Sequence, residues 1–338
     1  MPTTRRPLLR AGLATLLAAP LATPALRRAR AAAITFAHQD MVTPMRAGIA
    51  DGSLARAAGA EIAWRKFAGG ADVLRAMASG DVQIGEMGSS PIATAASQGM
   101  DVQLFWILDD IADAEQLVAR NASGIADVAG LRGRTVAVPF VSTAHYQLAY
   151  VLEKAGLRPR DLRLLNMRPP EIAAAWTRGD IDAAFVWDPV LARLKQDGRV
   201  LVSAGDIARQ GRPTFDGIVV QRRWAEANRP FMAALVKAIA ARDAAYRAGP
   251  AAWTPESPEV QAVARVTGAA AADVPAALAA YRFPTLAEQA SDAWLGGGAA
   301  RALADTAAFL KEQGRVPAVA PDYGRFVTAE YVRAAAAG

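Results

Sequence analysis

The segment ASGDVQIGEMGSSP, residues 78–91, contains the pattern that decides the fold. A glycine and an aspartate end a helical stretch, a short β-forming run follows, and a serine–proline pair begins another helix. The segment TRGDIDAAFVWDP, residues 177–189, repeats this order. The aspartates of the two turns, Asp81 and Asp180, are 99 residues apart, which is about the length of a small domain. This spacing predicts two similar α/β lobes, because solenoid repeats have shorter periods.

Strands and helices alternate on both sides of this repeat. Short β-forming runs at 34–37, 61–67 and 135–138 are each followed by a segment with a helical pattern. After residue 223 the sequence is alanine-rich and helical in character to its end. Alternation of this kind is typical of layered α/β proteins. We therefore expect mostly parallel sheets with flanking helices and a helical C-terminal region.

Residues 1–33 have the layout of an export signal. Arg5 and Arg6 precede an apolar run at 11–26 that prolines interrupt, and small residues follow near the expected cleavage site. The run is too short for a good transmembrane span. The arginine pair resembles a twin-arginine signal, and an ordinary Sec signal is the alternative. We expect export of the mature chain to the periplasm.

The positive charge of the chain originates in this signal. The sequence has 38 Lys and Arg and 32 Asp and Glu, but six of the arginines and none of the acids lie in residues 1–33. The remainder is balanced, whereas a nucleic-acid-binding protein keeps a basic surface, so this class is excluded. The chain has no cysteine and only two histidines, His38 and His145. These counts exclude thiolate and multi-histidine metal centres, and we expect no metal and no cofactor.

The sequence offers little for an enzyme. It has no P-loop, no dinucleotide-binding glycine motif and no nucleophile elbow. Ser142 precedes His145 by three residues on one helical turn, which is a poor geometry for a nucleophile and its base. We expect no catalytic residues, and an enzyme on the same scaffold is the contrasting alternative.

Hydroxyl groups at two strand–helix junctions predict an anion-binding site. Gly88-Ser89-Ser90 and Ser142-Thr143 each follow a predicted strand, and α/β proteins bind ligands at such strand ends. Free N–H groups, hydroxyls and the helix dipole there attract an anion such as a sulfonate, although the same residues would also serve as plain helix caps. Trp187-Asp188 occupies the equivalent junction of the second lobe, and Thr214-Phe215-Asp216 precedes the last predicted strand. An indole contact and a carboxylate–ammonium pair are the interactions we expect from these residues.

Several segments together resemble the periplasmic taurine-binding proteins of ABC importers, within the nitrate/sulfonate/taurine family of solute-binding proteins. The resemblance implies a two-lobe periplasmic-binding-protein fold of type II that captures its ligand between closing lobes. It implies taurine or a close zwitterionic sulfonate as the ligand, and a membrane permease with its ATPase as partners. We expect a monomer; aliphatic sulfonates and betaine-like amines are the alternative ligands. The segments are 60–91, 138–146, 169–176, 178–182 and 309–319.

The strand and helix pattern, together with the resemblance, predicts a domain plan and a set of ligand-binding residues. After the signal at 1–33, the first part of lobe 1 is expected at 34–117, lobe 2 at 118–207, and the return to lobe 1 with the C-terminal helices at 208–338. The expected ligand-binding residues are Gln39, Glu86, Gly88, Ser89, Ser90, Ser142, Thr143, His145, Trp187, Asp188, Thr214 and Asp216.

Acidic residues distinguish this chain from the family pattern. Glu86 and Asp188 stand where the pattern has asparagine and alanine, and Asp109-Asp110 replaces less acidic residues. Glu115 extends this acidic strip, which would ordinarily be read as a solvated loop. Extra carboxylates near the cleft favour a cationic or zwitterionic ligand over a bare sulfonate. We expect Asp216 to be the main partner of a ligand ammonium, followed by Asp188 and Glu86.

Overall fold

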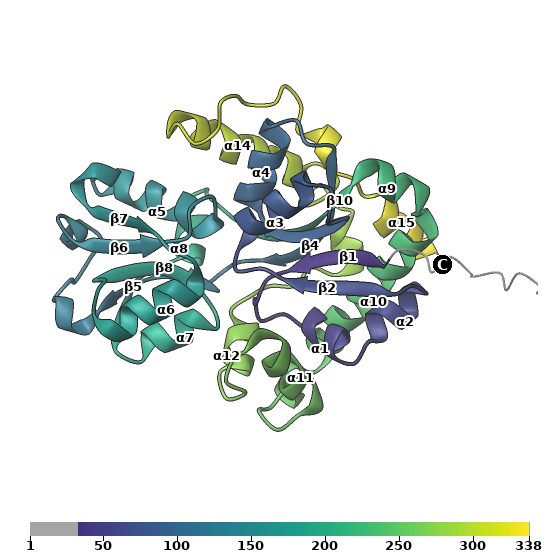
Figure 1. The fold of residues 1–338 in the computed structure, drawn as a ribbon, viewed down its shortest axis with the longest axis horizontal. Helices are drawn as coiled ribbons and strands as arrows, with labels where there is room; N and C mark the ends of the chain where they lie inside the picture. The colour runs from purple at the N-terminus through teal and green to yellow at the C-terminus, as the bar shows by residue number, and fades with distance from the viewer. Residues whose placement is uncertain (1–32, 338) are drawn as a thin grey trace, which may run out of the picture. The chain divides into compact units, whose positions relative to one another are not determined.

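The computed structural model describes residues 33–337 of the chain (Figure 1). The predicted export signal therefore lies outside the described residues, except for Ala33. None of the helices described is both long enough and apolar enough to cross a membrane.

The first of two five-stranded sheets combines early and late segments of the chain. Its strands are β1 (Ile34–His38), β2 (Ile62–Lys66), β3 (Ile84–Gly88), β4 (Val102–Asp110) and β10 (Phe215–Gln221). Their order is β2-β1-β3-β10-β4, so the late strand β10 lies between two early ones. Strand β1 is parallel to β2 and β3, whereas β10 is antiparallel to both of its neighbours.

The second sheet has the same plan. Its strands are β5 (Glu115–Arg120), β6 (Thr135–Val138), β7 (Arg163–Asn166), β8 (Ala183–Trp187) and β9 (Gly198–Ser203). The order is β7-β6-β8-β5-β9, with β5 antiparallel to β8 and β9. Two α/β sheets are confirmed, and both are mixed. The sequence pattern marks strands but not their direction, so it gave no sign that β5 and β10 run against their neighbours.

The internal repeat is visible in the strand register. Ile84 of β3 pairs with Phe36 of β1, and Ala183 of β8 pairs with Val136 of β6. Ile84 and Ala183 are separated by the same 99 residues as Asp81 and Asp180. Strands β3 and β8 are therefore equivalent central strands, and the repeat in the sequence reports two copies of one sheet plan.

The chain passes between the sheets twice, at 111–114 and at 204–214. The expected boundary after residue 117 would divide β5, and the one after 207 falls inside helix α8 (Ala204–Ala208). The first crossing thus comes earlier than expected, because the strand formers of β5 begin at Glu115. The lobe ranges themselves stay a prediction.

Helices cover both sheets and form the C-terminal region (Figure 1). Up to residue 203 they are α1 (Met45–Ala50), α2 (Ser53–Ala58), α3 (Gly70–Ala78), α4 (Ser89–Ser97), α5 (Thr143–Lys154), α6 (Pro169–Arg178) and α7 (Val190–Lys195). After α8 they are α9 (Arg222–Ala227), α10 (Arg229–Ala248), α11 (Pro258–Thr267), α12 (Val274–Ala279), α13 (Leu286–Gln289), α14 (Gly298–Glu312) and α15 (Glu330–Ala337). Helix α4 begins at Ser89 with Gly88 as its N-cap, so Ser90 is not the cap that the serine–proline pair had predicted.

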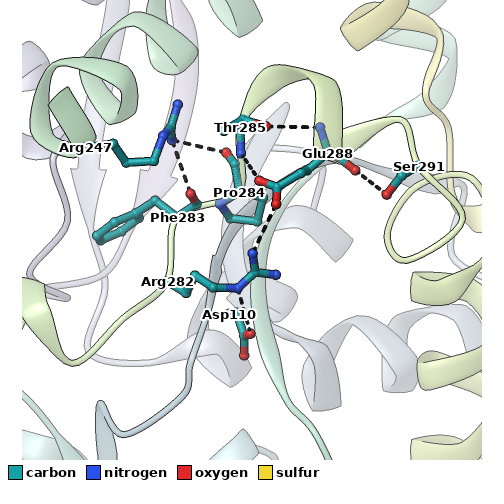
Figure 2. A network of polar contacts seen from close by, with 8 residues as sticks. All are labelled: Asp110, Arg247, Arg282, Phe283, Pro284, Thr285, Glu288 and Ser291. Atoms are coloured by element: carbon teal, nitrogen blue, oxygen red, sulfur yellow. Dashed lines mark hydrogen bonds and ion pairs between the residues drawn. The ribbon is translucent and has the colours of Figure 1, made fainter.

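The C-terminal region is tied to the end of β4. The backbone groups of Arg282 and Asp110 exchange two hydrogen bonds of 2.8 and 3.0 Å. The Arg282 side chain reaches both the Asp110 carboxylate and Glu288 of α13, as Figure 2 shows. The chain after α12 is therefore fixed beside the first crossing between the sheets.

One buried carboxyl in α10 has no part in this network. Asp243 is fully buried, neither of its oxygens has a hydrogen-bond partner among the described residues, and burial raises its pKa well above the usual value. A carboxyl whose pKa is higher in the folded state costs stability as pH rises above its unfolded value near 4.

We expect Asp243→Asn to raise the free energy of unfolding at pH 7.5 by about 1–2 kcal/mol, with the gain disappearing near pH 4. Urea unfolding at both pH values measures this. Asp305→Asn, at an exposed position of α14, is the matched control and should change little. Equal effects of the two variants at pH 7.5 would contradict the prediction.

Candidate functional site

A closed pocket lies between the two sheets. The first sheet and its helices contribute Gln39, Met41, Gly70, Gly88, Pro91 and Asp216, the second contributes Glu115, Ser142, Thr143 and Trp187, and the C-terminal region contributes Tyr281. Gly88 and Trp187 are the last residues of the equivalent strands β3 and β8, at the carboxyl ends where α/β sheets bind ligands. The remaining volume is about 10 Å³, which is about the room that one water molecule needs. We call this arrangement, in which the walls of the pocket meet, the closed form; a larger ligand requires the walls to move apart.

A larger cavity continues outward from this pocket. It has a volume of about 360 Å³, and Gly70, Ser142 and Trp187 line both spaces. Arg168, at the start of α6, forms an ion pair across this opening with Asp72 of α3, with Nε–Oδ2 at 3.1 Å. The pocket is therefore the inner end of a cleft whose outer edges are joined by opposite charges.

Strand pairing places one carboxylate from each sheet in the pocket. Asp216 lies opposite Gly88 in the register of β10 with β3, and Glu115 lies opposite Trp187 in the register of β5 with β8. The two carboxylates therefore occupy equivalent positions of the repeat. Both are at least 95% buried, and the charge of Asp216 raises the pKa of Glu115.

Two further carboxyls lie behind this pair. Asp109 is the neighbour of Asp216 across β4 and β10, and Glu86 lies on β3 two residues before Gly88. Glu86 accepts a 2.6 Å hydrogen bond from Arg46, and both side chains are fully buried. One arginine thus faces four buried carboxyls, and an unpaired charge in such a place is costly.

The pKa values reflect this excess of acid. Burial and the nearby Asp216 raise the pKa of Glu115 to about 8. Burial and Glu86 raise the pKa of Asp216 to about 7, although Asp109 and Arg46 oppose the shift. Burial and the charge of Asp216 raise the pKa of Asp109 well above its usual value. In the closed form these carboxyls need either protons or a cation.

The buried carboxyls of the pocket are not grouped as a metal site. Within residues 33–337, no three His, Asp or Glu side chains are arranged to hold a metal. The acidic strip noted in the sequence is not a solvated loop: Asp109 and Glu115 are buried on β4 and β5, and only Asp110 reaches the surface, where it pairs with Arg282.

The two helix starts at the pocket differ. Ser142 caps α5, since its Oγ accepts from the His145 N–H at 3.0 Å and donates to the Pro139 carbonyl at 2.6 Å. Thr143 Oγ1 donates to Glu115 at 2.6 Å. By contrast, no side chain caps α4, and the buried hydroxyls of Ser89 and Ser90 have no hydrogen-bond partner within the described chain. The start of α4 is therefore the better place for an anion.

His145 does not reach the pocket, contrary to the expectation from the sequence. Its ring stacks on the ring of Phe140, with the ring centres 4.5 Å apart. The Arg315 guanidinium carbon lies 5.1 Å from the centre of the Phe140 ring. Burial, and then Arg315, lower the pKa of His145 to about 4. Two residues correspond to about 200° around a helix, so a helix that turns Thr143 toward the pocket turns His145 away from it.

Five other predicted residues also lie outside the pocket lining, and two of them are Ser89 and Ser90, whose hydroxyls are buried at the start of α4. Asp188 Oδ1 accepts the Ala192 N–H at 2.9 Å and so caps the start of α7. Thr214 accepts a 2.8 Å hydrogen bond from Gln147 on α5. Glu86 acts one layer behind the pocket, where it binds the Gln39 N–H at 3.1 Å as well as Arg46. Gln39, Gly88, Ser142, Thr143, Trp187 and Asp216 are the predicted residues that do line it.

The sequence did not reveal Tyr281, Met41, Gly70 or Pro91. Tyr281 lies in the alanine-rich helical region, far from any motif, and reaches the pocket only because the C-terminal region folds back onto β4. The structure explains why residue 70 is a glycine, because a Cβ there would lie 2.8 Å from Pro91 Cγ. None of these four has a sequence signal that points to a ligand.

Comparisons with known proteins agree with this architecture. Residues 27–255 match the model of the NMT1-like family. The chain belongs to the NMT1-like family. The chain is 40% identical to the taurine-binding periplasmic protein of Escherichia coli (strain K12) over 306 residues, which cover 90% of this chain and 94% of that protein.

Solved structures show the same fold as this NMT1-like chain. The alkanesulfonate-binding protein SsuA from Xanthomonas axonopodis pv. citri, bound to MOPS, has a TM-score of 0.71 at 24% identity and covers 90% of this chain and 98% of its own. The periplasmic aliphatic sulphonate binding protein SsuA from E. coli has a TM-score of 0.70 at 24% identity and covers 88% and 92%. The two-lobe periplasmic-binding-protein fold is confirmed.

Gly88 allows the two sheets to approach each other. A Cβ at this position would lie 2.8 Å from Thr143 Cγ2 and 3.2 Å from Asp216 Oδ1. The backbone of Gly88 is extended, a conformation open to any residue. The absence of a side chain is therefore required for space across the pocket and not for the backbone.

We expect Gly88→Ala to weaken, by at least about tenfold, the binding of any ligand that requires the two sheets to close, because closure meets the new methyl group. Taurine, which the name of the E. coli relative contains, is the first compound to test. Thr143→Ser in the same chain removes Cγ2 but keeps the hydroxyl, and it should restore part of the affinity. Gly69→Ala is the control, since its Cβ has 4.0 Å to the nearest atom, Gln39 Oε1. Calorimetry measures all four proteins. The steric explanation fails if the double variant binds no better than Gly88→Ala.

Proposed function

We propose that this chain is the periplasmic solute-binding component of an ABC importer and that it binds taurine or a closely related zwitterionic sulfonate. The observation that carries the proposal is the pair of buried carboxylates, Asp216 and Glu115, that the two sheets bring together at one pocket. The similarity to the E. coli taurine-binding protein supports the same ligand.

An ammonium group between these carboxylates explains why they are buried. Two carboxylates close together in a low-dielectric site repel each other unless a cation lies between them. A ligand ammonium supplies that cation, and each charge-assisted hydrogen bond to it is stronger than a neutral one. Asp216 and Glu115 come from different sheets, so the ammonium also links the two lobes.

The sulfonate end is assigned to the start of α4. Its first-turn N–H groups have no side-chain cap, and Ser89 and Ser90 add two buried hydroxyls. Helix N-termini carry a partial positive charge that favours anions. The start of α5 contributes less, since Ser142 and Thr143 already have partners there.

This arrangement gives a mechanism for capture. The pocket is closed with almost no free volume, so the ligand enters while the lobes are apart. Closure then brings Asp216 and Glu115 together, which costs free energy without a cation and is favourable with one. The ligand thereby shifts the population toward the closed form. No covalent step is required.

An aliphatic sulfonate is the second candidate, because the solved structures of the same fold are named for sulfonate binding. An uncharged tail would leave both carboxylates without a partner in the closed pocket. The charges of this chain therefore favour the zwitterion. A permease with its ATPase, export to the periplasm and a monomeric state complete the proposal.

We expect Asp216→Asn, which keeps the shape and removes the charge, to weaken taurine binding about 30-fold or more, since loss of one partner of a buried charge pair costs about 2–5 kcal/mol. Asp188→Asn is the matched control and should change affinity little, because Asp188 caps α7. Calorimetry on the mature chain should also give one taurine per chain.

Two results would oppose the proposal. If ethanesulfonate binds the wild type more tightly than taurine does, the ligand is an aliphatic sulfonate. If NMR after incubation shows taurine converted to a product, the chain is an enzyme.

The pH dependence should separate the two ligand classes. Closure around ethanesulfonate requires protons on Glu115 and Asp216, whose pKa values are about 8 and 7 in the closed form. Groups with a higher pKa in the bound state favour binding below that pKa. Ethanesulfonate affinity should therefore rise from pH 8 to pH 6, by up to about tenfold per pH unit for each proton bound. Taurine brings its own cation, so its affinity should change much less; parallel pH profiles would contradict the assignment.

A further inference from the structure

Tyr281 brings a third polar group to the two carboxylates of the pocket. It is the one lining residue from the C-terminal region. Its side chain is buried, and its hydroxyl has no hydrogen-bond partner within residues 33–337. A buried polar group without a partner is costly, so this hydroxyl is available for an interaction with a ligand.

The backbone around Tyr281 is held from both sides. Before it, the Ala280 carbonyl accepts from the Asp113 N–H at 3.0 Å, within the first crossing. After it, Arg282 is joined to Asp110 through its backbone and side chain, and Arg247 donates to the Phe283 and Pro284 carbonyls at 3.2 and 3.3 Å (Figure 2). Groups held in this way keep a fixed geometry when a ligand arrives, which lowers the entropic cost of binding.

The surroundings of the Tyr281 hydroxyl are acidic. Burial raises the pKa of Tyr281 well above the usual value, and nearby negative charges add to the shift. The charges are those of Asp109, Asp216, Asp188 and Glu115. The hydroxyl is therefore neutral at physiological pH. A neutral phenol can accept a hydrogen bond from a cation while its own proton points to a carboxylate.

A primary ammonium has three N–H donors. Asp216 and Glu115 provide acceptors from the two sheets, and the Tyr281 hydroxyl oxygen adds an acceptor from the C-terminal region that has no hydrogen-bond partner within residues 33–337.

We propose that Tyr281 is a specificity-determining residue that selects a primary ammonium over methylated ammonium groups by accepting one of its N–H bonds. This inference rests on the proposed function, since it concerns the same ammonium. It disfavours betaine-like ligands, because a quaternary ammonium has no N–H group to donate to the Tyr281 hydroxyl.

The test compares taurine with N,N,N-trimethyltaurine on the mature chain by calorimetry. The wild type should bind taurine at least about 100-fold more tightly. Tyr281→Phe removes only the hydroxyl and should weaken taurine about tenfold or more, because a hydrogen bond to a charged group is lost. It should weaken trimethyltaurine little, so the ratio between the two ligands narrows.

Tyr246→Phe is the matched control. Tyr246 is a buried tyrosine whose ring packs edge-on against Trp253 and Phe283, and it does not line the pocket. Its variant should keep both affinities. The melting temperature of each variant shows whether the fold is retained.

The outcomes separate this inference from the proposed function. If the wild type binds taurine but Tyr281→Phe binds it equally well, the inference is overturned and the proposed function stands. If the wild type binds trimethyltaurine as tightly as taurine, the selectivity is overturned whatever the variant does. If the wild type binds no taurine, both are wrong.

Discussion

The structure depends on how it accommodates buried negative charge between two sheets. Four carboxyls and one arginine meet at the inner end of the cleft, and only Glu86 has an ion-pair partner there. An excess of buried carboxyls is unfavourable unless protons or a ligand cation neutralise it. The closed form is thus stable only in combination with something that supplies positive charge. Closure of the lobes therefore depends on whether the ligand supplies a positive charge.

The internal repeat explains how one carboxylate from each sheet reaches the same pocket. Strands β3 and β8 are equivalent, and each has an antiparallel neighbour that begins directly after a crossing between the sheets. These neighbours, β10 and β5, carry Asp216 and Glu115. Asp216 moves with the first sheet and Glu115 with the second, so separation of the sheets also separates the two charges.

Much of the fold could be predicted from the sequence, because turn residues and alternating patterns act locally. The Gly-Asp turns gave the repeat, and Gly88, Thr143 and Trp187 were placed at the strand–helix junctions where the structure has them. His145 and Asp188 could not be placed, since one or two positions along a helix or strand turn a side chain to another face. Tyr281 could not be found at all. It reaches the pocket through long-range contacts of Arg282 with β4, and such contacts leave no local pattern.

The pair formed by Gly88 and Trp187 has a consequence for the direction of the ligand. These residues end the two equivalent strands and line one pocket. One wall of the pocket therefore has a glycine without a side chain, and the equivalent position of the other wall has an indole. A pocket with matching walls would accept a linear molecule in either of two orientations. Here the equivalence of the two sheets ends at the pocket, because Gly88 and Trp187 occupy the same position of the repeat but differ in size and chemistry. A molecule with two different ends therefore has one favourable orientation in the pocket. The difference between Gly88 and Trp187 is what sets that orientation.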